Sequence, residues 1–142
     1  MEIINKKAKF NYQIIETFEA GISLLGAEVK AIKRGKIDLS ASFVKPIGNE
    51  LYLINASISV GNVNFEYNST RIRKLLLKRS EINYIVSKLK SARLTIVPVR
   101  VYNVGRLIKL EITLAKGKKA KDKKESLKRR VVDREIARSL KV

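Results

Sequence analysis

Four apolar residues at alternate positions, Ile108, Leu110, Ile112 and Leu114, place the strongest constraint on the fold of this chain. Successive side chains of a β-strand point to opposite faces, so these four share one face and the polar residues between them share the other. Segment 95–101 alternates in the same way, and residues 103–106 turn the chain between the two. The sequence therefore predicts an antiparallel strand pair with one buried face.

Earlier segments predict further strands. Lys9 to Thr17 alternates with Phe10, Tyr12 and Ile14 on one face, and we expect this strand to extend through Phe18. Segments 42–47 and 50–58 are also strand-like. Gly48-Asn49 between them is a two-residue hairpin signal, and Pro46 marks the first segment as an edge or a strand end.

Two segments show helical spacing instead. Leu25, Val29 and Ile32 lie on one face of a short helix that Gly35 stops. A second helix is predicted to begin at Ser80, with apolar residues at positions 82, 85, 86 and 89. The polar segment 60–70 between these helices predicts a loop.

Together these elements predict a mainly β fold, a small antiparallel OB-like barrel over residues 1–114 with two or three flanking helices. Closing the sheet is the most economical arrangement for so many short strands in so few residues. A barrel of this kind is a frequent nucleic-acid scaffold, although fold alone does not decide function.

Residues 115–142 form a basic C-terminal tail that contains 12 of the 31 Lys and Arg and 4 of the 13 Asp and Glu. So few apolar side chains cannot offset the entropy of ordering, so we expect the tail to be disordered when free. Its second half, from Ser126, holds good helix formers and an apolar stripe that includes Ile136 and Leu140, which predicts a helix on an anionic partner. The alternative interpretation is a solvated tail that only aids solubility.

The net charge of +18 favours nucleic acid as the partner, with an anionic membrane surface as the competing polyanion. No apolar run approaches the roughly 18 residues of a spanning helix, and the N-terminus lacks the apolar core of a signal peptide, so we expect a cytoplasmic protein that is not in a membrane. The chain contains neither His nor Cys, and its glycines form neither GxGxxG nor a Walker A motif. We therefore expect no enzymatic activity, no metal and no cofactor.

Four clusters of basic residues indicate where nucleic acid would bind: Asn5-Lys6-Lys7, then Lys30, Lys33, Arg34 and Lys36, then Arg71, Arg73, Lys74, Lys78 and Arg79, and finally Lys116, Lys118 and Lys119 around Gly117. Each cluster alone has an ordinary explanation as a solvated face. Aromatic residues decide less. Phe10, Tyr12 and Phe18 are predicted to be core residues, whereas Tyr52, Phe65, Tyr67 and Tyr102 would stack on bases only if exposed.

The clusters, taken in order, resemble the SsrA-binding protein (small protein B) family. The matching segments are Asn5-Lys6-Lys7-Ala8, Phe18-Glu19-Ala20-Gly21, Glu28-Val29-Lys30, Gly35-Lys36, Arg71-x-Arg73-Lys74-Leu75-Leu76-Leu77, Ala115-Lys116-Gly117-Lys118-Lys119, and the tail pieces Asp122-Lys123, Leu127-Lys128-x-Arg130 and Arg134-Glu135-Ile136-Ala137-Arg138. They cover nearly the whole chain.

The resemblance implies a protein, expected to be a monomer, that binds the tRNA-like domain of transfer-messenger RNA (tmRNA) through the four clusters and Glu19. It implies that the tail enters the decoding centre, built from 16S ribosomal RNA, and the empty mRNA channel of a stalled ribosome. The tail residues that would act there are Lys121, Asp122, Lys123, Lys124, Lys128, Arg130, Arg134, Ile136, Arg138 and Leu140.

This chain departs from the family pattern at three places in the tail. Lys121 and Lys124 stand where the family often has His and Arg, and Val131-Val132 replaces a more polar or aromatic pair. Two alternatives remain open at this point. The first is a constitutive basic ribosomal protein, and the second is a nuclease that uses carboxylates.

Overall fold

The computed structural model describes residues 1–117, and the predictions for residues 118–142 fall outside this range. The elements, in chain order, are β1 (Glu2–Ile4), α1 (Lys6–Asn11), β2 (Tyr12–Ile22), α2 (Gly26–Lys33), β3 (Ile37–Asp38), β4 (Phe43–Ile47), β5 (Glu50–Ile54), β6 (Ser57–Ile58), β7 (Arg73–Leu76), α3 (Arg79–Ala92), β8 (Thr95–Val104) and β9 (Leu107–Gly117).

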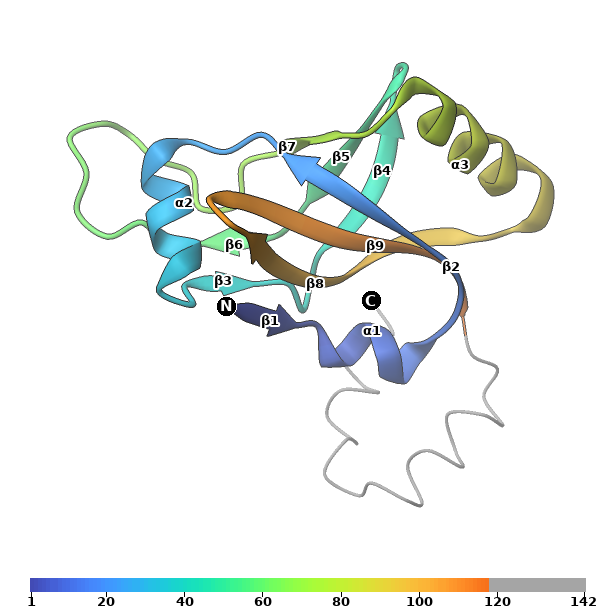
Figure 1. Cartoon of the computed structure of the whole chain (residues 1–142), viewed down its shortest axis with the longest axis horizontal. Helices are drawn as coiled ribbons and strands as arrows, with labels where there is room; N and C mark the ends of the chain where they lie inside the picture. Colours follow the sequence, from blue (N-terminus) through green and yellow to red (C-terminus); the bar gives the residue numbers. More distant parts are fainter. Residues whose placement is uncertain (118–142) are drawn as a thin grey trace.

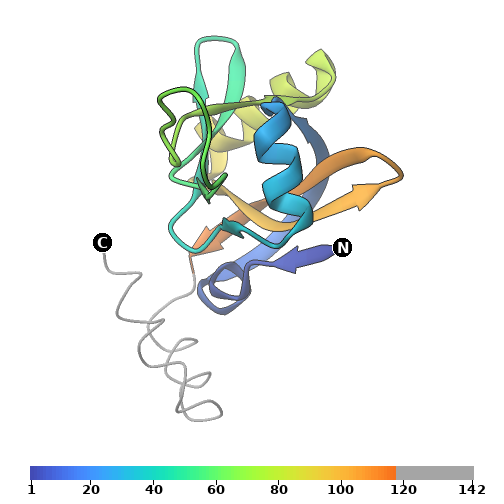
Figure 2. The same ribbon diagram turned by 90° about the vertical axis from the view of Figure 1, so that its left-hand side faces the viewer.

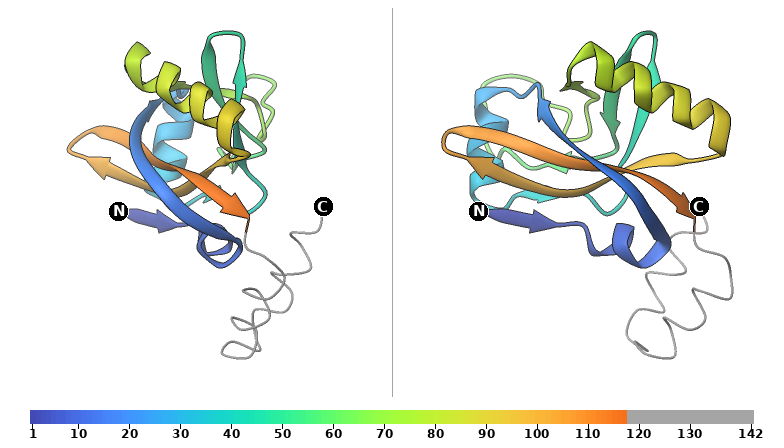
Figure 3. Two further views of the ribbon diagram at one scale, coloured as in Figure 1. Left: turned by 90° about the vertical axis from the view of Figure 1, so that its right-hand side faces the viewer. Right: turned by 45° about the vertical axis from the view of Figure 1, so that its right-hand side comes forward.

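The strands of the main sheet form a closed ring. Their hydrogen-bonded order is β8-β4-β5-β7-β2-β9, and β9 pairs again with β8, all in antiparallel directions. The ring is visible in Figures 1 and 3, where β8 and β9 form a long hairpin that β2 crosses. β1 pairs with the second half of β8 outside the ring, while β3 and β6 pair with each other next to α2. The predicted mainly β, antiparallel fold with flanking helices is confirmed.

The alternation in the last two strands is confirmed as a buried face. The side chains of Ile108, Leu110, Ile112 and Leu114 are at most 8% exposed and belong to the main core. Thr113, on the opposite face of β9, is also buried, and its hydroxyl donates to the Glu16 carbonyl oxygen at 2.9 Å, beside a bulge in β2. β9 runs on to Gly117, so residues 115–117, which the sequence placed in the tail, belong to the sheet.

The predicted strand from Lys9 is wrong in its first three residues, because residues 6–11 form α1 and β2 begins at Tyr12. Asn5 fixes the start of this helix: its side-chain amide donates to the carbonyl oxygens of Pro98 at 2.9 Å and Leu39 at 3.3 Å. Ala8 then packs with Val97 on β8. Ile14 is 43% exposed, so it does not share a buried face with the residues of α1.

The two predicted helices are confirmed with small shifts. α2 ends before Gly35, whose positive φ of 77° suits a chain reversal after a helix. α3 begins at Arg79, one residue before the predicted cap, where the Glu81 carboxylate accepts from the Lys78 backbone N–H at 3.1 Å. The Tyr84 hydroxyl donates to Glu16 at 2.6 Å, so α3 lies against β2 (Figure 3).

The middle of the chain differs from prediction at two places. The hairpin at Gly48 is confirmed by the pairing of Ile47 with Glu50. However, segment 50–58 is not one strand, because Asn55 adopts a left-handed φ of 63° that separates β5 from β6. Segment 60–70 is a loop, as predicted, and the strand β7 that follows it was not predicted.

Candidate nucleic-acid interface

The first candidate surface is a groove between α2 and the beginning of the 59–72 connection. Lys30, Arg34 and Lys36 line it, and all three side chains are exposed. The opposite wall is residues 59–63, which include Gly61. Since no Asp or Glu lines this groove, its charge favours a phosphate backbone. We call it the α2 groove.

A second groove lies between the middle of β2 and β7, and we call it the β7 groove. Glu19 and Lys74, both predicted from the sequence, line it together with Leu76, Lys78 and Lys109. This groove mixes both signs of charge because Glu50 and Glu81 also line it. Leu76 is 54% exposed, so the groove combines charged groups with an apolar contact surface.

Glu19 is held in place at the edge of the β7 groove. Its carboxylate accepts a hydrogen bond from the Tyr102 hydroxyl and pairs with the Lys109 ammonium at 3.8 Å. Burial, followed by the hydrogen bond to Glu19, raises the pKa of Tyr102 to about 12, so this hydroxyl remains a donor at neutral pH. The Glu19 side chain is still 54% exposed and can accept from a ligand.

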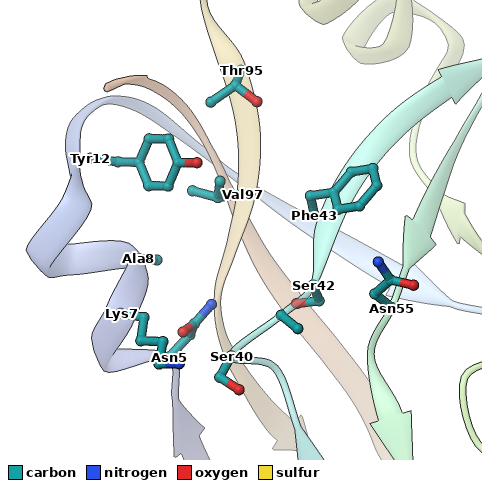
Figure 4. Close-up of a pocket in the computed structure, with 11 residues that line it drawn as sticks. Asn5, Lys7, Ala8, Tyr12, Ser40, Ser42, Phe43, Asn55, Thr95 and Val97 are labelled. Carbon is teal, nitrogen blue, oxygen red and sulfur yellow. The ribbon is translucent and has the colours of Figure 1, made fainter. Parts of the chain in front are cut away.

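The third candidate surface is a pocket between α1, the start of β4 and the start of β8 (Figure 4), with a volume of about 540 Å³. We call it the α1 pocket, and Asn5 and Lys7 from the first predicted cluster line it. Tyr12, on its wall, pairs with Gly117 across β2 and β9, and Gln13 pairs with Lys116. The first cluster and the described part of the fourth cluster therefore lie at the same end of the ring.

Arg71 and Arg73 both pair with Glu28 of α2 (Arg71 Nη2 with Oε1, Arg73 Nη2 with Oε2 at 2.5 Å). Arg73 and Glu28 have fully buried side chains, whereas Arg71 is 30% exposed. The structure thus puts Arg73 in the core and not at an RNA-facing surface. A charged residue is tolerated there because its guanidinium also donates to the carbonyl oxygens of Ala56 and Ser69.

Glu28 stays ionised despite its burial. Desolvation by itself would raise the pKa of this carboxyl. Hydrogen bonds from Arg71, the Leu25 backbone N–H, Arg73 and Tyr67 outweigh that effect and lower the pKa from 4.5 to about 2. The Tyr67 hydroxyl lies 2.9 Å from Glu28 Oε2 and 2.9 Å from the Ile58 carbonyl oxygen, so this cluster also ties the 59–72 connection to α2.

The other predicted residues are distributed as follows. Lys6, Lys74, Lys116 and Gly117 are exposed, and the Asn5 side chain is buried at the base of α1. Lys118, Lys119 and the tail residues from Lys121 to Leu140 lie outside the described residues. Within residues 1–117 no cluster of acidic side chains is arranged to hold a metal ion, and no helix has the length and apolar character needed to cross a membrane.

Lys78 belongs to the third predicted basic cluster, whereas no pattern in the sequence singles out Leu76 or Lys109 as groove residues. These three join Glu19 only through the pairing of Gly21 with Leu76 and with Lys109 on the two sides of β2. Pairings between strands so distant in the chain leave no local signal. A cluster of Lys and Leu after the loop was the only available hint.

Comparisons with known proteins show which family this chain belongs to. The SmpB protein family matches residues 2–142. The chain belongs to this family. The recognition made from the sequence is therefore confirmed, and the SmpB family match extends over the described ring and through the tail.

Individual SmpB relatives cover the same range. The SsrA-binding protein of Trichormus variabilis is 45% identical over 96% of this chain and 90% of its own length, and that of Mesoplasma florum is 44% identical over 97% and 95%. Among solved structures, a chain from work described as "tmRNA-SmpB: a journey to the center of the bacterial ribosome" superposes with a TM-score of 0.70. It is 37% identical and covers 89% of this chain and 94% of that chain.

Proposed function

We propose that this protein is an RNA-binding adaptor that binds the tRNA-like domain of tmRNA and delivers it to stalled ribosomes for trans-translation. The observation that carries this function is the full-length similarity to SsrA-binding proteins, together with the match to a chain solved in a study of tmRNA and the ribosome. The basic, acid-free α2 groove is a surface of the kind that such a role requires.

The described residues suggest how the RNA would be held. Lys30, Arg34 and Lys36 in the α2 groove would neutralise backbone phosphates. Glu19 differs from them because a carboxylate only accepts, so it would receive hydrogen bonds from base or ribose donors in the β7 groove. Arg73 is proposed not to touch RNA but to hold Glu28, and through Glu28 the wall of the α2 groove.

The tail has a separate proposed role. Residues 118–142 would extend from the end of β9 into the decoding centre and the empty mRNA channel, with Lys121 to Lys124 near 16S ribosomal RNA. The chain charge and the family pattern of residues 122–138 support this proposal. We also propose that the protein acts in the cytoplasm, where ribosomes work, and that it supplies binding and no catalysis.

The test is binding of a labelled tRNA-like domain by the full chain and by a shortened chain that ends after Lys119. Because the ring of strands closes by Gly117, we expect the shortened chain to fold and to keep most of the affinity. If it folds but loses binding, the proposed division between ring and tail is wrong.

A constitutive ribosomal protein is the alternative function, since such proteins also thread basic tails through ribosomal RNA. Co-sedimentation with ribosomes separates the two. A rescue factor is expected on a small, stalled fraction that grows when ribosomes are made to stall on truncated mRNA. Equal occupancy of all ribosomes, unchanged by stalling, would favour the constitutive protein.

A further inference from the structure

The α1 pocket has the lining of a site for a flat ring. It is formed by residues from α1, β2, the 39–42 loop, β4, the β5–β6 turn and β8: Asn5, Lys7, Ala8, Tyr12, Ser40, Ala41, Ser42, Phe43, Asn55, Thr95 and Val97. Its volume of about 540 Å³ is within the range of ligand pockets in proteins. The strands that build it are joined in one sheet, so the pocket is formed before any ligand arrives.

Two aromatic rings stand on its walls. In Figure 4, Tyr12 enters from the β2 side with its hydroxyl toward the middle of the pocket, Phe43 stands on the β4 side, and Val97 of β8 lies between them. Phe43 is 38% exposed although its ring would gain from burial. An aromatic ring left exposed in a pocket is available to stack on a heterocyclic base.

Polar groups complete the lining. Asn55 contributes a side-chain amide, which both donates and accepts, next to Phe43 (Figure 4). Asn55 holds a left-handed φ of 63°, a conformation that costs free energy in most residues and is tolerated best by Asn and Gly.

The charge around the pocket suits a nucleotide. Lys7 lines it, and no Asp or Glu does. Asp38, which does not line the pocket, attracts Lys7 electrostatically. Its carboxylate accepts a hydrogen bond from the Ser40 backbone N–H at 2.9 Å. Exposed Lys6 and Lys9 on α1 and Lys116 on β9 lie around the same end of the ring.

We propose that the α1 pocket binds a single unpaired nucleobase of the RNA, stacked against Phe43 and Tyr12, hydrogen-bonded by Asn55, with its phosphate near Lys7. This inference rests on the proposed RNA-binding function and adds a site separate from the α2 and β7 grooves. A base inside a duplex cannot enter, because it would first have to leave its stack at a cost of a few kcal/mol. The pocket therefore selects a single-stranded segment.

The test uses the full chain and a six-nucleotide single-stranded RNA of adenosines with one central 2-aminopurine, whose fluorescence falls on stacking. The chain contains no Trp, so protein fluorescence does not obscure the signal. We expect saturable quenching in the wild type and an affinity weaker by about fivefold or more in Phe43→Ala, since a base stacked on an aromatic ring contributes about 1–3 kcal/mol. Phe65→Ala, which removes a 51% exposed ring outside the pocket, is the matched control and should bind normally.

Asn55→Gly separates binding from folding. Glycine accepts the left-handed backbone without strain, so thermal stability should stay the same or rise while the amide is lost and the affinity falls at least threefold. Wild-type affinity and quenching in both Phe43→Ala and Asn55→Gly would overturn the proposal. So would an equal loss in Phe65→Ala, because it would place the stacking elsewhere.

Two further measurements complete the test. One identifies the source of the base, and the other distinguishes failure of the pocket proposal from failure of the proposed function. Adenosine monophosphate should compete only at concentrations far above those of the oligonucleotide, and competition at equal concentration would replace an RNA base by a free nucleotide as the ligand. Binding of the tRNA-like domain is measured in the same variants. If wild-type protein binds the oligonucleotide but not this domain, the proposed function fails and the pocket stands. If it binds the domain but not the oligonucleotide, the pocket proposal fails alone.

Discussion

Arg73 and Glu28 form a buried ion pair between β7 and α2, with the Arg73 Nε 2.9 Å from Glu28 Oε2 and both side chains fully buried. The two residues come from β7 and α2, 45 positions apart. Tyr67 and Arg71 complete the shell around the carboxylate. The pair and its partners therefore connect three segments: the helix of the α2 groove, the 59–72 connection and β7.

Removing the Glu28 charge should destabilise the fold strongly. Glu28→Gln leaves the buried Arg73 without its counter-charge, and the loss of one member of a buried pair costs about 3–5 kcal/mol. Denaturant unfolding measures the change in the free energy of unfolding. Glu50→Gln is the matched control, because its pairs with Arg79 and Lys74 lie at the surface and should contribute less than about 1 kcal/mol. Equal effects in the two variants would contradict the assignment of Glu28 as a core residue.

The same carboxylate should make stability depend on acid pH. The pKa of Glu28 is lower in the folded protein (about 2) than its ordinary value of 4.5, so the unfolded state binds the proton more readily. Its contribution is fully present above pH 4.5 and disappears as the pH falls toward 2, with a magnitude on the order of 3 kcal/mol. The stability difference between wild type and Glu28→Gln should therefore shrink from pH 6 to pH 2. A constant difference would exclude this linkage.

Gly117 provides a test of close approach by the RNA. A Cβ at this exposed position meets no atom within 4 Å, so Gly117→Ala and Gly117→Glu should both fold with wild-type thermal stability. Gly117→Glu adds a negative charge beside Lys116, and we expect at least a ten-fold loss of tmRNA affinity. Gly117→Ala adds a methyl group without charge, so a loss of affinity in this variant would show that the RNA approaches the glycine closely, and a loss in Gly117→Glu alone would show an effect of charge. Unfolding of Gly117→Glu would instead indicate a structural role.

The α2 groove should be detectable through salt. If Lys30 and Arg34 each neutralise one phosphate, the double variant Lys30→Ala/Arg34→Ala should lower the slope of log affinity against log salt concentration by about 2. Lys45→Ala/Lys90→Ala removes the same charge from exposed positions outside the groove. An identical change of slope in this control would mean that net charge, and not the groove, determines binding.

Ile136→Pro tests the proposed helix of the tail. Proline removes a backbone donor and costs about 3 kcal/mol in helix free energy, yet every basic residue of the tail remains. We expect this variant to bind tmRNA and to reach the ribosome but to fail in peptide tagging. Wild-type tagging would leave the tail as a simple polycation.

Much of the fold is predictable because β8 and β9 carry their pattern locally. In β9, Ile108, Leu110, Ile112 and Leu114 face the core and the residues between them point to the other side of the strand. The period of two is therefore visible in the sequence. At α1 the same rule failed. Phe10 and Tyr12 alternate as in a strand, but the Asn5 side chain and the packing of Ala8 on Val97 select a short helix, and both contacts join residues about 90 positions apart.

The candidate site was predicted less completely than the fold for a related reason. Charge and local spacing correctly place Lys30, Arg34 and Lys36 at the surface, since cations on one side of a short helix and just beyond its end favour solvent. Arg73 belongs to an equally basic segment, and only Glu28 from a distant helix makes its burial possible. The α1 pocket was predicted only in part: the first basic cluster supplies Asn5 and Lys7, but the other lining residues come from separate segments that share no local pattern.

The closure of the ring also bears on how the protein is made. Thr113 and Glu16, which β9 and β2 bring together, are 97 residues apart in the chain, so this contact closes a loop nearly as long as the folded body. Such contacts bear the largest closure entropy and slow folding. A nascent chain that has not yet released β9 from the ribosome keeps the edges of β2 and β8 open, and open edges are prone to pair with other chains. Ribosomes that halt before β9 is made thus produce a chain in which β2 and β8 each keep one open edge and the RNA-binding body is unfinished.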